Sequence, residues 1–277
     1  MVSSIHTNSA AMSALQVLNQ TNRDLETTQN RVASGFEVAS ARDNSAVFAV
    51  AQNMRGDIGS LNAVKDSLNR ANSVIDVALA GSEAISDLLI QMREKALAAS
   101  DPSLDATSRL AYNEDFQSIL NQIQTIVGDS SFDGANLLNG SVTNGISFVA
   151  DMDASDQITL GAEDLSLGGT IITFAATASL GSATLASGLI STIDTSLNNV
   201  NAALARLGAT ANRLDTHIGF VSKLMDSLEV GVGNLVDADM AKESARLTAL
   251  QTKQQLSTQA LSIANQNSQS ILSLFQG

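Results

Sequence analysis

The 277-residue sequence contains no cysteine, no tryptophan and a single proline, and only 3% of its residues are aromatic. Without cysteine, disulfide bonds, thiolate catalysis and cysteine-bound zinc are excluded. The one proline, Pro102, leaves the rest of the chain without forced helix breaks. Because thick globular cores use many aromatic side chains, their scarcity favours a slender helical bundle.

Long apolar runs and leader-like segments are also missing. No stretch approaches the ~18 consecutive apolar residues of a membrane-spanning helix, so we predict no membrane insertion. The N-terminal sequence MVSSIHTNSAAMSALQ has neither the basic start nor the apolar centre of a cleaved signal peptide. We expect any export to use a route that does not depend on such a peptide.

Positive charge is absent from the middle of the chain. Between Arg109 and Arg206 there is no Lys or Arg, and this part carries −10 of the formal net charge of −13. A nucleic-acid-binding protein needs a clustered basic surface, which the sequence lacks. We therefore predict no nucleic-acid partner, a solvated acidic middle, and nearly neutral ends that suit close packing.

Motifs for catalysis or metal binding are weak. The two histidines, His6 and His217, are far apart in the sequence, and there is no HExxH motif. Residues 151–158, DMDASDQI, imitate the start of a calcium loop. However, Asp156 stands where the sharp turn needs glycine, and Ala162 stands where a bidentate glutamate belongs. The sequence predicts no metal, no cofactor, no catalytic residue and no enzyme activity.

The C-terminal stretch, residues 240–275, has the clearest periodicity. Every third and fourth residue falls on one seam over about five heptads, and no Gly or Pro interrupts it. Polar residues share the seam with Leu and Ile, and a buried polar group must find a hydrogen-bond partner. We expect this helix to need other helices, from this chain or from further copies. The seam consists of Met240, Glu243, Leu247, Leu250, Gln254, Ser257, Leu261, Ala264, Ser268, Ile271 and Phe275.

A second seam with the same spacing runs through residues 4–32. Its small residues allow close approach of another helix. We predict that it pairs with the C-terminal seam, because both are long, uninterrupted and half polar. The alternative is an amphipathic helix that packs on some other core. The seam consists of Ser4, Thr7, Ala11, Ala14, Leu18, Thr21, Leu25, Thr28 and Val32.

Between the two ends, the pattern predicts helices at 44–100, 105–127 and 189–230 and hairpins at about 144–177, with connectors at 34–43 and 231–239. The apolar run at 171–174 is expected to be one of the short strands. In the helix at 105–127 the residues expected to face inward are Leu110, Phe116, Ile119, Leu120, Ile123 and Ile126. The seam of the helix at 44–100 is expected to consist of Val47, Val50, Met54, Asp57, Leu61, Val64, Leu68, Ala71, Ile75, Ala78, Ser82, Ile85, Leu89, Met92 and Ala96. A straight helix over 44–100 would be about 85 Å long, whereas a compact chain of this length has a radius of gyration of about 19 Å. The expected fold is mainly α. It is a long antiparallel helical rod or coiled-coil bundle with a small β-hairpin region, and its N- and C-terminal helices are paired at one end.

Segments near both ends identify a family. Together they resemble bacterial flagellin, in the right order and spacing, over about the first half and the last third of the chain. The strings are IHTNSAAMSALQVLN, RVASGFEVASARDNSAV, LGATANRLD, VDADMAKESARLTALQ and IANQNSQSILSLF. Departures from the usual pattern are Glu37, Asn44 and Val47-Phe48. All lie in or beside the first connector, so we expect them to change local contacts and to leave the helices intact.

The resemblance implies a short flagellin whose outer variable domains are nearly absent. Residues 1–33 and 240–277 would form the two halves of an inner coiled-coil domain, and residues 44–230 a rod-like outer domain. Such a subunit leaves the cell through the flagellar type III export apparatus, with an export chaperone. It then polymerises beneath the filament cap into the extracellular filament used for swimming. The implied partners are copies of itself, related flagellins, and the cap and junction proteins.

We predict that apolar residues of the two terminal seams mediate subunit assembly. One alternative is the hook–filament junction protein, which shares both termini, and another is a soluble coiled-coil scaffold. The strings VDADMAKESARLTALQ and LGATANRLD favour flagellin, and a scaffold would be helical independently of assembly. The predicted assembly residues are Leu18, Leu25, Val32, Leu247, Leu250, Leu261, Ala264, Ile271 and Phe275.

Residues 89–95, LIQMREK, match the segment that resembles the immune-receptor epitope of many flagellins. Leu89, Arg93 and Glu94 form the candidate receptor surface, and Arg93 and Glu94 agree with the epitope. At the differing positions one charge is lost and one apolar contact becomes cationic, so we predict weak recognition. A cell reporter assay with purified monomer measures it, and strong activation at low dose would contradict the prediction. The differing residues are Ile90, Gln91 and Lys95.

Overall fold

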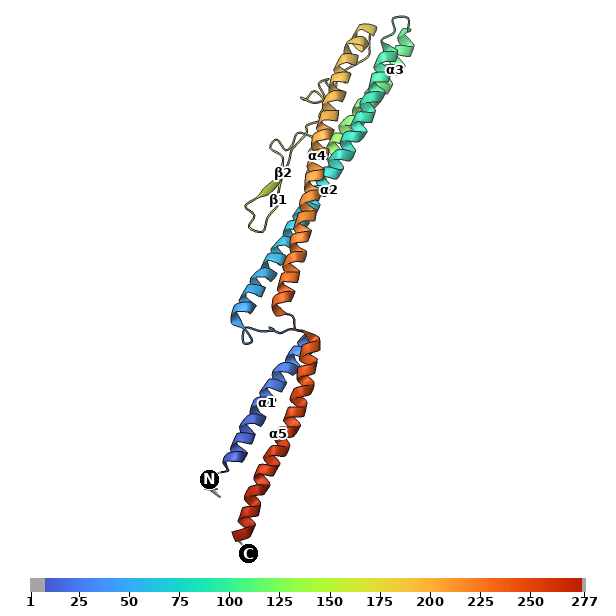
Figure 1. Ribbon diagram of the computed structural model, residues 1–277. Helices are drawn as coiled ribbons and strands as arrows, with labels where there is room; N and C mark the ends of the chain where they lie inside the picture. The colour runs from blue at the N-terminus through green and yellow to red at the C-terminus, as the bar shows by residue number, and fades with distance from the viewer. Residues whose placement is uncertain (1–7, 276–277) are drawn as a thin grey trace. The chain divides into compact units, whose positions relative to one another are not determined.

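The computed structural model describes residues 8–275, and the side chains of residues 8–266. The described residues form five α-helices and one two-stranded antiparallel sheet (Figure 1), which confirms the predicted mainly α class. The elements are α1 (Ser9–Ser34), α2 (Ser45–Ala99), α3 (Ala106–Asp129), β1 (Ile146–Val149), β2 (Gln157–Leu160), α4 (Ala183–Val236) and α5 (Met240–Phe275). Over this part of the chain, no helix combines the length and the apolar character needed to cross a membrane.

Helix α1 begins and ends at local capping signals. The Asn8 side chain accepts a hydrogen bond from Ala11 N at 3.0 Å, so the helix begins at Ser9. Residues 4–7, which the predicted helix included, lie outside the described residues. At the other end Gly35 adopts a left-handed φ of 78° and donates its N–H to Arg31 O at 2.9 Å. Glycine reaches this conformation without steric cost, which explains the stop.

Helix α4 is longer than predicted at both ends. The apolar periodicity predicts a helix over 189–230, but α4 spans Ala183–Val236 and contains Gly188, Gly231 and Gly233. The connector predicted at 231–239 is therefore wrong over 231–236. A glycine costs a helix only about 1 kcal/mol relative to alanine. Burial of Ala186, Val232 and Val236 offsets that cost at the two ends.

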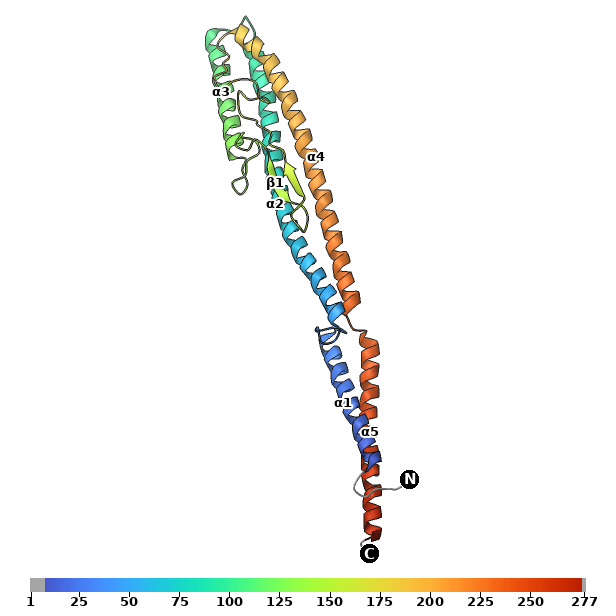
Figure 2. The same ribbon diagram turned by 90° about the vertical axis from the view of Figure 1, so that its left-hand side faces the viewer.

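The chain divides into two compact units. One combines the N-terminal part up to Gly56 with the C-terminal part from Ser227, and the other is Asp57–Asp226. In the second unit, α2 packs antiparallel to α3 and α4, and both views show the three helices side by side (Figures 1 and 2). Ion pairs join these helices, from Arg93 to Asp194 at 2.5 Å and from Lys95 to Asp115 at 2.6 Å.

The core of the second unit follows the predicted seam of α2. From Leu61 onward, every residue at the alternating three- and four-residue spacing is buried. The preceding seam positions are less enclosed: Val47 and Met54 are half-buried, and Val50 and Asp57 are exposed. The buried series is Leu61, Val64, Leu68, Ala71, Ile75, Ala78, Ser82, Ile85, Leu89, Met92 and Ala96.

Helix α3 confirms most of its predicted inner face. Of the residues predicted to face inward, Phe116, Ile119, Leu120 and Ile123 are buried and Ile126 is half-buried, and Val127, which was not predicted to face inward, is also buried. Leu110, also predicted to point inward, is 57% exposed, so that part of the prediction is wrong. Leu110 lies in the second turn, where Arg109 instead reaches the end of α2 and donates to Ala99 O at 3.1 Å.

The β region is smaller than predicted. Strands β1 and β2 pair antiparallel, with Ile146 opposite Leu160 and Val149 opposite Gln157. The apolar run at 171–174 was predicted to be a strand, but it has no strand partner and lies in coil. Ile172 and Phe174 in this run are nevertheless buried, so the run marks burial rather than strand pairing, which a short apolar run cannot distinguish.

Polar contacts hold the coil between β2 and α4 onto the helices. Arg206 donates from Nε and Nη2 to the two carboxylate oxygens of Glu163, at 2.7 and 2.6 Å. These hydrogen bonds raise the pKa of Arg206. Further along, the Asn113 side chain accepts from Leu180 N at 2.7 Å. The acidic middle is therefore part of a packed unit and not a loose insertion.

Close packing in this unit predicts a strong effect at Gly81 of α2. A Cβ there would stand 2.9 Å from Leu138 Cδ1 and closer still to Ser130 Oγ, which donates to Ile126 O at 2.6 Å. Gly81→Ala should lower the free energy of unfolding by about 1–3 kcal/mol, because overpacking outweighs the gain in helix propensity. Denaturant unfolding followed by circular dichroism measures the change.

Gly59→Ala is the matched control. Gly59 lies in the same helix, and a Cβ there would meet nothing within 4 Å. This change should raise stability by about 0.5–1 kcal/mol. Equal stabilisation by both substitutions would contradict the close contact at Gly81.

Candidate assembly interface

Helices α1 and α5 lie side by side and run antiparallel (Figure 2). The Gln254 side chain donates to Asn22 Oδ1 at 2.8 Å, and the Asn8 side chain donates to Ala264 O at 2.9 Å. These contacts confirm that the two terminal seams face each other. The alternative, in which the N-terminal helix packs on another core, is wrong.

Burial along this pair repeats every seven residues, as the heptad spacing predicts. In α1 the buried residues are Thr21 and Thr28, and over the described side chains of α5 they are Glu243, Leu250 and Ser257. Four of these five are polar, so the centre of the seam is poor in apolar contacts. The other predicted assembly residues with described side chains are half-buried: Leu18, Leu25, Val32, Leu247, Leu261 and Ala264.

Two predicted assembly residues cannot be placed in this way. Ile271 and Phe275 belong to α5, but their side chains lie outside the described ones. Met240, the first residue of the predicted seam, is 44% exposed.

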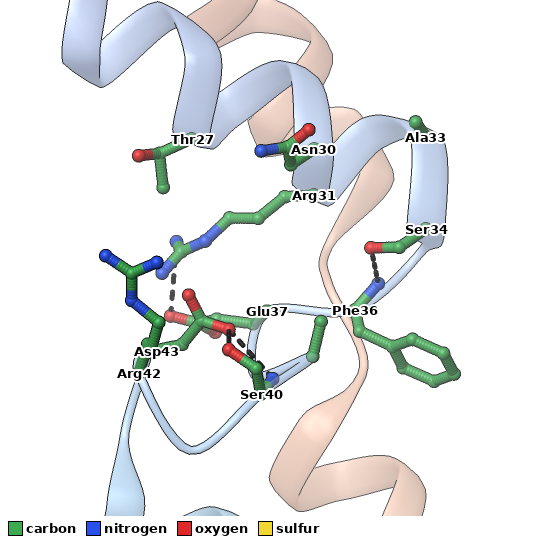
Figure 3. A pocket seen from close by; sticks show the side chains of 11 residues that line it. Thr27, Asn30, Arg31, Ala33, Ser34, Phe36, Glu37, Ser40, Arg42 and Asp43 are labelled. Atoms are coloured by element: carbon green, nitrogen blue, oxygen red, sulfur yellow. Dashed lines mark hydrogen bonds and ion pairs between the residues drawn. The ribbon is translucent and has the colours of Figure 1, made fainter.

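A buried ion pair closes the seam near the connectors. Arg31 Nη1 lies 3.4 Å from Glu243 Oε1, and the Glu243 side chain is only 6% exposed. Glu37 and Arg246 approach the same pair at 3.7 and 4.0 Å (Figure 3 shows Arg31 directed toward Glu37). Two buried atoms of the pair, Arg31 Nε and Glu243 Oε2, have no hydrogen-bond partner. A charge pair with unmet hydrogen bonds costs desolvation energy, so it contributes more to register than to stability.

The two connectors are hydrogen-bonded to each other. Phe36 and Asp237 form an antiparallel bridge, Glu37 N donates to Val236 O at 2.7 Å, and Ala238 N donates to Gly35 O at 2.8 Å. These backbone bonds hold the end of α1 beside the start of α5. The backbone hydrogen bonds between the connectors therefore align the two helices independently of the seam side chains.

Large apolar side chains also point away from the pair. On α1, Met12 and Leu15 are 64% and 47% exposed, and on α5, Leu256 and Ile263 are 59% and 61% exposed. Leu256 and Ile263 are seven residues apart, so they lie on one face of α5. Exposed apolar groups at a regular spacing are typical of a surface that packs against another protein chain.

The residues considered for metal binding and catalysis have other contacts. The Asp151 carboxylate accepts hydrogen bonds from Ser155 within one turn, and these lower the pKa of Asp151. His217 donates from Nε2 to Ala150 O at 2.8 Å, because a carbonyl oxygen can only accept. His6 lies outside the described residues. Among residues 8–275, no group of His, Asp and Glu is arranged to hold a metal ion.

The candidate receptor surface needs one correction. Leu89 is fully buried in the core of the second unit, so it cannot be a surface residue of the folded chain. Arg93 and Glu94 are exposed, and Arg93 is paired with Asp194. The heptad spacing of α2 already predicts that Leu89 is buried. The match to the epitope segment predicted the opposite and was wrong at this residue.

Comparison with known proteins agrees with this architecture. The sequence models for the bacterial flagellin N-terminal and C-terminal helical regions match residues 5–143 and 190–275. This chain belongs to the bacterial flagellin family. A flagellin of Caulobacter vibrioides, FljM, is 52% identical over 275 residues, which is 99% of each chain. A Brucella melitensis flagellin is 37% identical over the full length of both chains.

Solved structures share the fold of this flagellin. The crystal structure of Bacillus cereus flagellin matches with a TM-score of 0.50 at 24% identity, over 56% of this chain and 88% of that one. The structure of a putative flagellar hook-associated protein from Vibrio parahaemolyticus matches with a TM-score of 0.55 at 15% identity, over 70% and 100%. With its full-length flagellin relatives, this flagellin is a structural subunit of the flagellar filament, which it forms by self-assembly.

The buried pair of this flagellin gives a double-variant prediction. Arg31→Met should destabilise the α1–α5 pair by up to about 3–5 kcal/mol, because the buried Glu243 carboxylate then keeps only the long, 4.0 Å contact with Arg246. Arg31→Met combined with Glu243→Leu should be neutral or stabilising, because no charge is then buried. Amide exchange of α1 and α5 in assembled filaments measures both. Equal loss of protection in the single and double variants would contradict the prediction.

Proposed function

We propose that the α1–α5 pair is the assembly module of this flagellin, lining the central channel of the filament, and that residues 44–230 form its outer domain. The observation that carries this proposal is the polar, thin seam of the pair together with the apolar residues on its outer faces. A two-helix pair can shield only the stripe between its helices. Further copies supply the missing contacts in the filament lattice.

The energy balance of the pair supports this role. Full burial of a Leu side chain stabilises by about 1.5–3 kcal/mol. Among the described side chains of α1 and α5, Leu250 is the one large apolar residue that is buried. Ordering each backbone residue costs about 1–2 kcal/mol. The pair therefore depends on contacts made during assembly, whereas the second unit has a long apolar core of its own.

The same balance suits export as an unfolded chain. Terminal segments with few buried apolar side chains unfold at a small free-energy cost. The sequence also has no cysteine, so no disulfide bond would hinder the passage of the unfolded chain through an export channel. We infer export through the flagellar type III apparatus with a chaperone on the terminal segment. Incorporation beneath the cap protein then orders α1 and α5, and junction proteins join the filament to the hook.

The alternative function is that of a hook–filament junction protein, because the fold also matches a putative flagellar hook-associated protein. At 15% identity this likeness concerns the fold alone. The flagellin relatives, at up to 52% identity over whole chains, favour the filament subunit. Copy number separates the two: a filament subunit occurs throughout the appendage, and a junction protein forms one short zone.

The assembly role gives a direct test at Leu250, which is 8% exposed between α1 and α5. Leu250→Asp should abolish filament formation, because it buries an unpaired carboxylate in the seam. The second unit should keep its helicity, since Leu250 lies outside it. Electron microscopy after seeding, together with circular dichroism of the subunit, measures both effects.

Leu250→Met is the control for this test. It keeps the volume and apolar character of the side chain and should cost less than about 1.5 kcal/mol, so filaments should still form. Normal filaments from Leu250→Asp would overturn the role proposed for the α1–α5 pair.

A further inference from the structure

Two of the hollows at the surface of the unit that contains both terminal helices are formed by the connectors. The first has a volume of about 750 Å³ and is formed by the end of α1 and the connector that follows it (Figure 3). Arg42 lines it, and within the described part of the chain Arg42 takes part in no ion pair. Phe36, 37% exposed, supplies an apolar side chain to the same hollow.

The other charged residues of the first hollow are already engaged. Arg31 pairs with Glu243 and Glu37. Asp43 accepts hydrogen bonds from Ser40 N at 2.9 Å and Ser40 Oγ at 3.0 Å. Arg42 therefore supplies the free charge of this hollow.

The second hollow, about 480 Å³, is formed by the end of α4 and the connector to α5. Three acidic residues line it, and one of them has a structural role: Asp239 accepts from Ala241 N and Lys242 N and so caps α5. Glu229 and Asp237 make no ion pair with any described residue. Val230 of the same hollow is 64% exposed.

The two hollows are complementary. One is lined by an arginine without an ion pair and, on its opposite side, by Phe36 (Figure 3), and the other is lined by two carboxylates without an ion pair and by the exposed Val230. Guanidinium groups bind carboxylates through directed, paired hydrogen bonds. The free charges of the two hollows do not reach each other within one chain, so they can be matched between chains.

We propose that the Arg42 hollow of one copy receives the Glu229–Asp237 edge of a second copy. This inference rests on the proposed self-assembly and names a contact within it. Because the self-assembly on which the inference rests continues into a filament, the contact is head-to-tail: each copy offers its Arg42 hollow to one neighbour and its Glu229–Asp237 edge to the next. A contact of that kind leaves a free patch on each side and continues into a ring or an open helical polymer. Charge pairing at such a surface selects the partner and speeds its approach.

Charge reversal separates this contact from other causes of failed assembly. Arg42→Glu places like charges on both patches, and so does the double change Glu229→Arg with Asp237→Arg. Each variant alone should elongate seeded filaments at least about 100-fold more slowly than the wild type, because like charges at an interface repel strongly. Light scattering and electron microscopy measure elongation.

An equal mixture of the two variants should restore elongation, because each patch of one variant now matches the opposite patch of the other. The triple variant Arg42→Glu, Glu229→Arg, Asp237→Arg should elongate by itself. Wild-type elongation should slow as salt rises from about 0.01 to 0.15 M, where the screening length falls from about 30 to 8 Å. Circular dichroism of each subunit verifies that the variants fold.

Arg55→Glu is the control, since Arg55 is exposed on α2 and lies outside both hollows. It should elongate like the wild type. The inference is overturned if the variants elongate normally alone, or if neither the mixture nor the triple variant recovers. In both cases wild-type filaments would still form, so the proposed function would stand. Failure of the wild type to form filaments would overturn the proposed function instead.

Discussion

Two antiparallel helices can bury only the surface between them, and this limit determines which residues are buried in the α1–α5 pair. One helix can cover a single stripe of its neighbour, and the stripe between α1 and α5 is occupied largely by Thr21, Thr28, Glu243 and Ser257. Polar groups there hold alignment but add little hydrophobic stabilisation. Apolar groups such as Leu256 and Ile263 point outward instead. These exposed apolar residues are the ones that the proposed assembly would cover with a further chain.

The second unit obeys the same heptad rule with a different result. Its longest helix is covered by α3, α4 and the coil between β2 and α4, so one seam can be filled with Leu, Ile, Val and Met from Leu61 to Ala96 and still be fully buried. The unit is complete as a single chain. The difference in burial between the two units therefore follows from how many neighbours each seam has, since the periodicity is shared.

Periodicity made most of the fold predictable. Helices α2 and α3 end within about two residues of their predicted bounds, within the usual uncertainty of helix ends, and the α1–α5 pairing was predicted from matched spacing. Failures occurred where a local signal competes with tertiary packing. Gly231 and Gly233 indicate a break in isolation, but buried Val232 and Val236 keep the helix intact. The apolar run at 171–174 resembles a strand, but it is buried without a strand partner. Leu89 matched a surface epitope while its spacing assigned it to the core.

The α1–α5 contact could be predicted only in part from the sequence, for a similar reason. Glu243 lies on the heptad seam and could be named as a polar member of it. Its partner Arg31 precedes the seam residue Val32 and does not belong to the seam itself. Arg31 reaches Glu243 because its side chain is long. Backbone bonds between the connectors, such as Ala238 N to Gly35 O, bring these two residues together. A slip of one helix along the other separates Arg31 from Glu243 and leaves each with only the longer contact to its own segment, to Glu37 at 3.7 Å and to Arg246 at 4.0 Å, so the native register is favoured. A pair of helices that gains little from apolar burial thus acquires a defined alignment from electrostatics, and with it a defined outer surface to present to the next subunit.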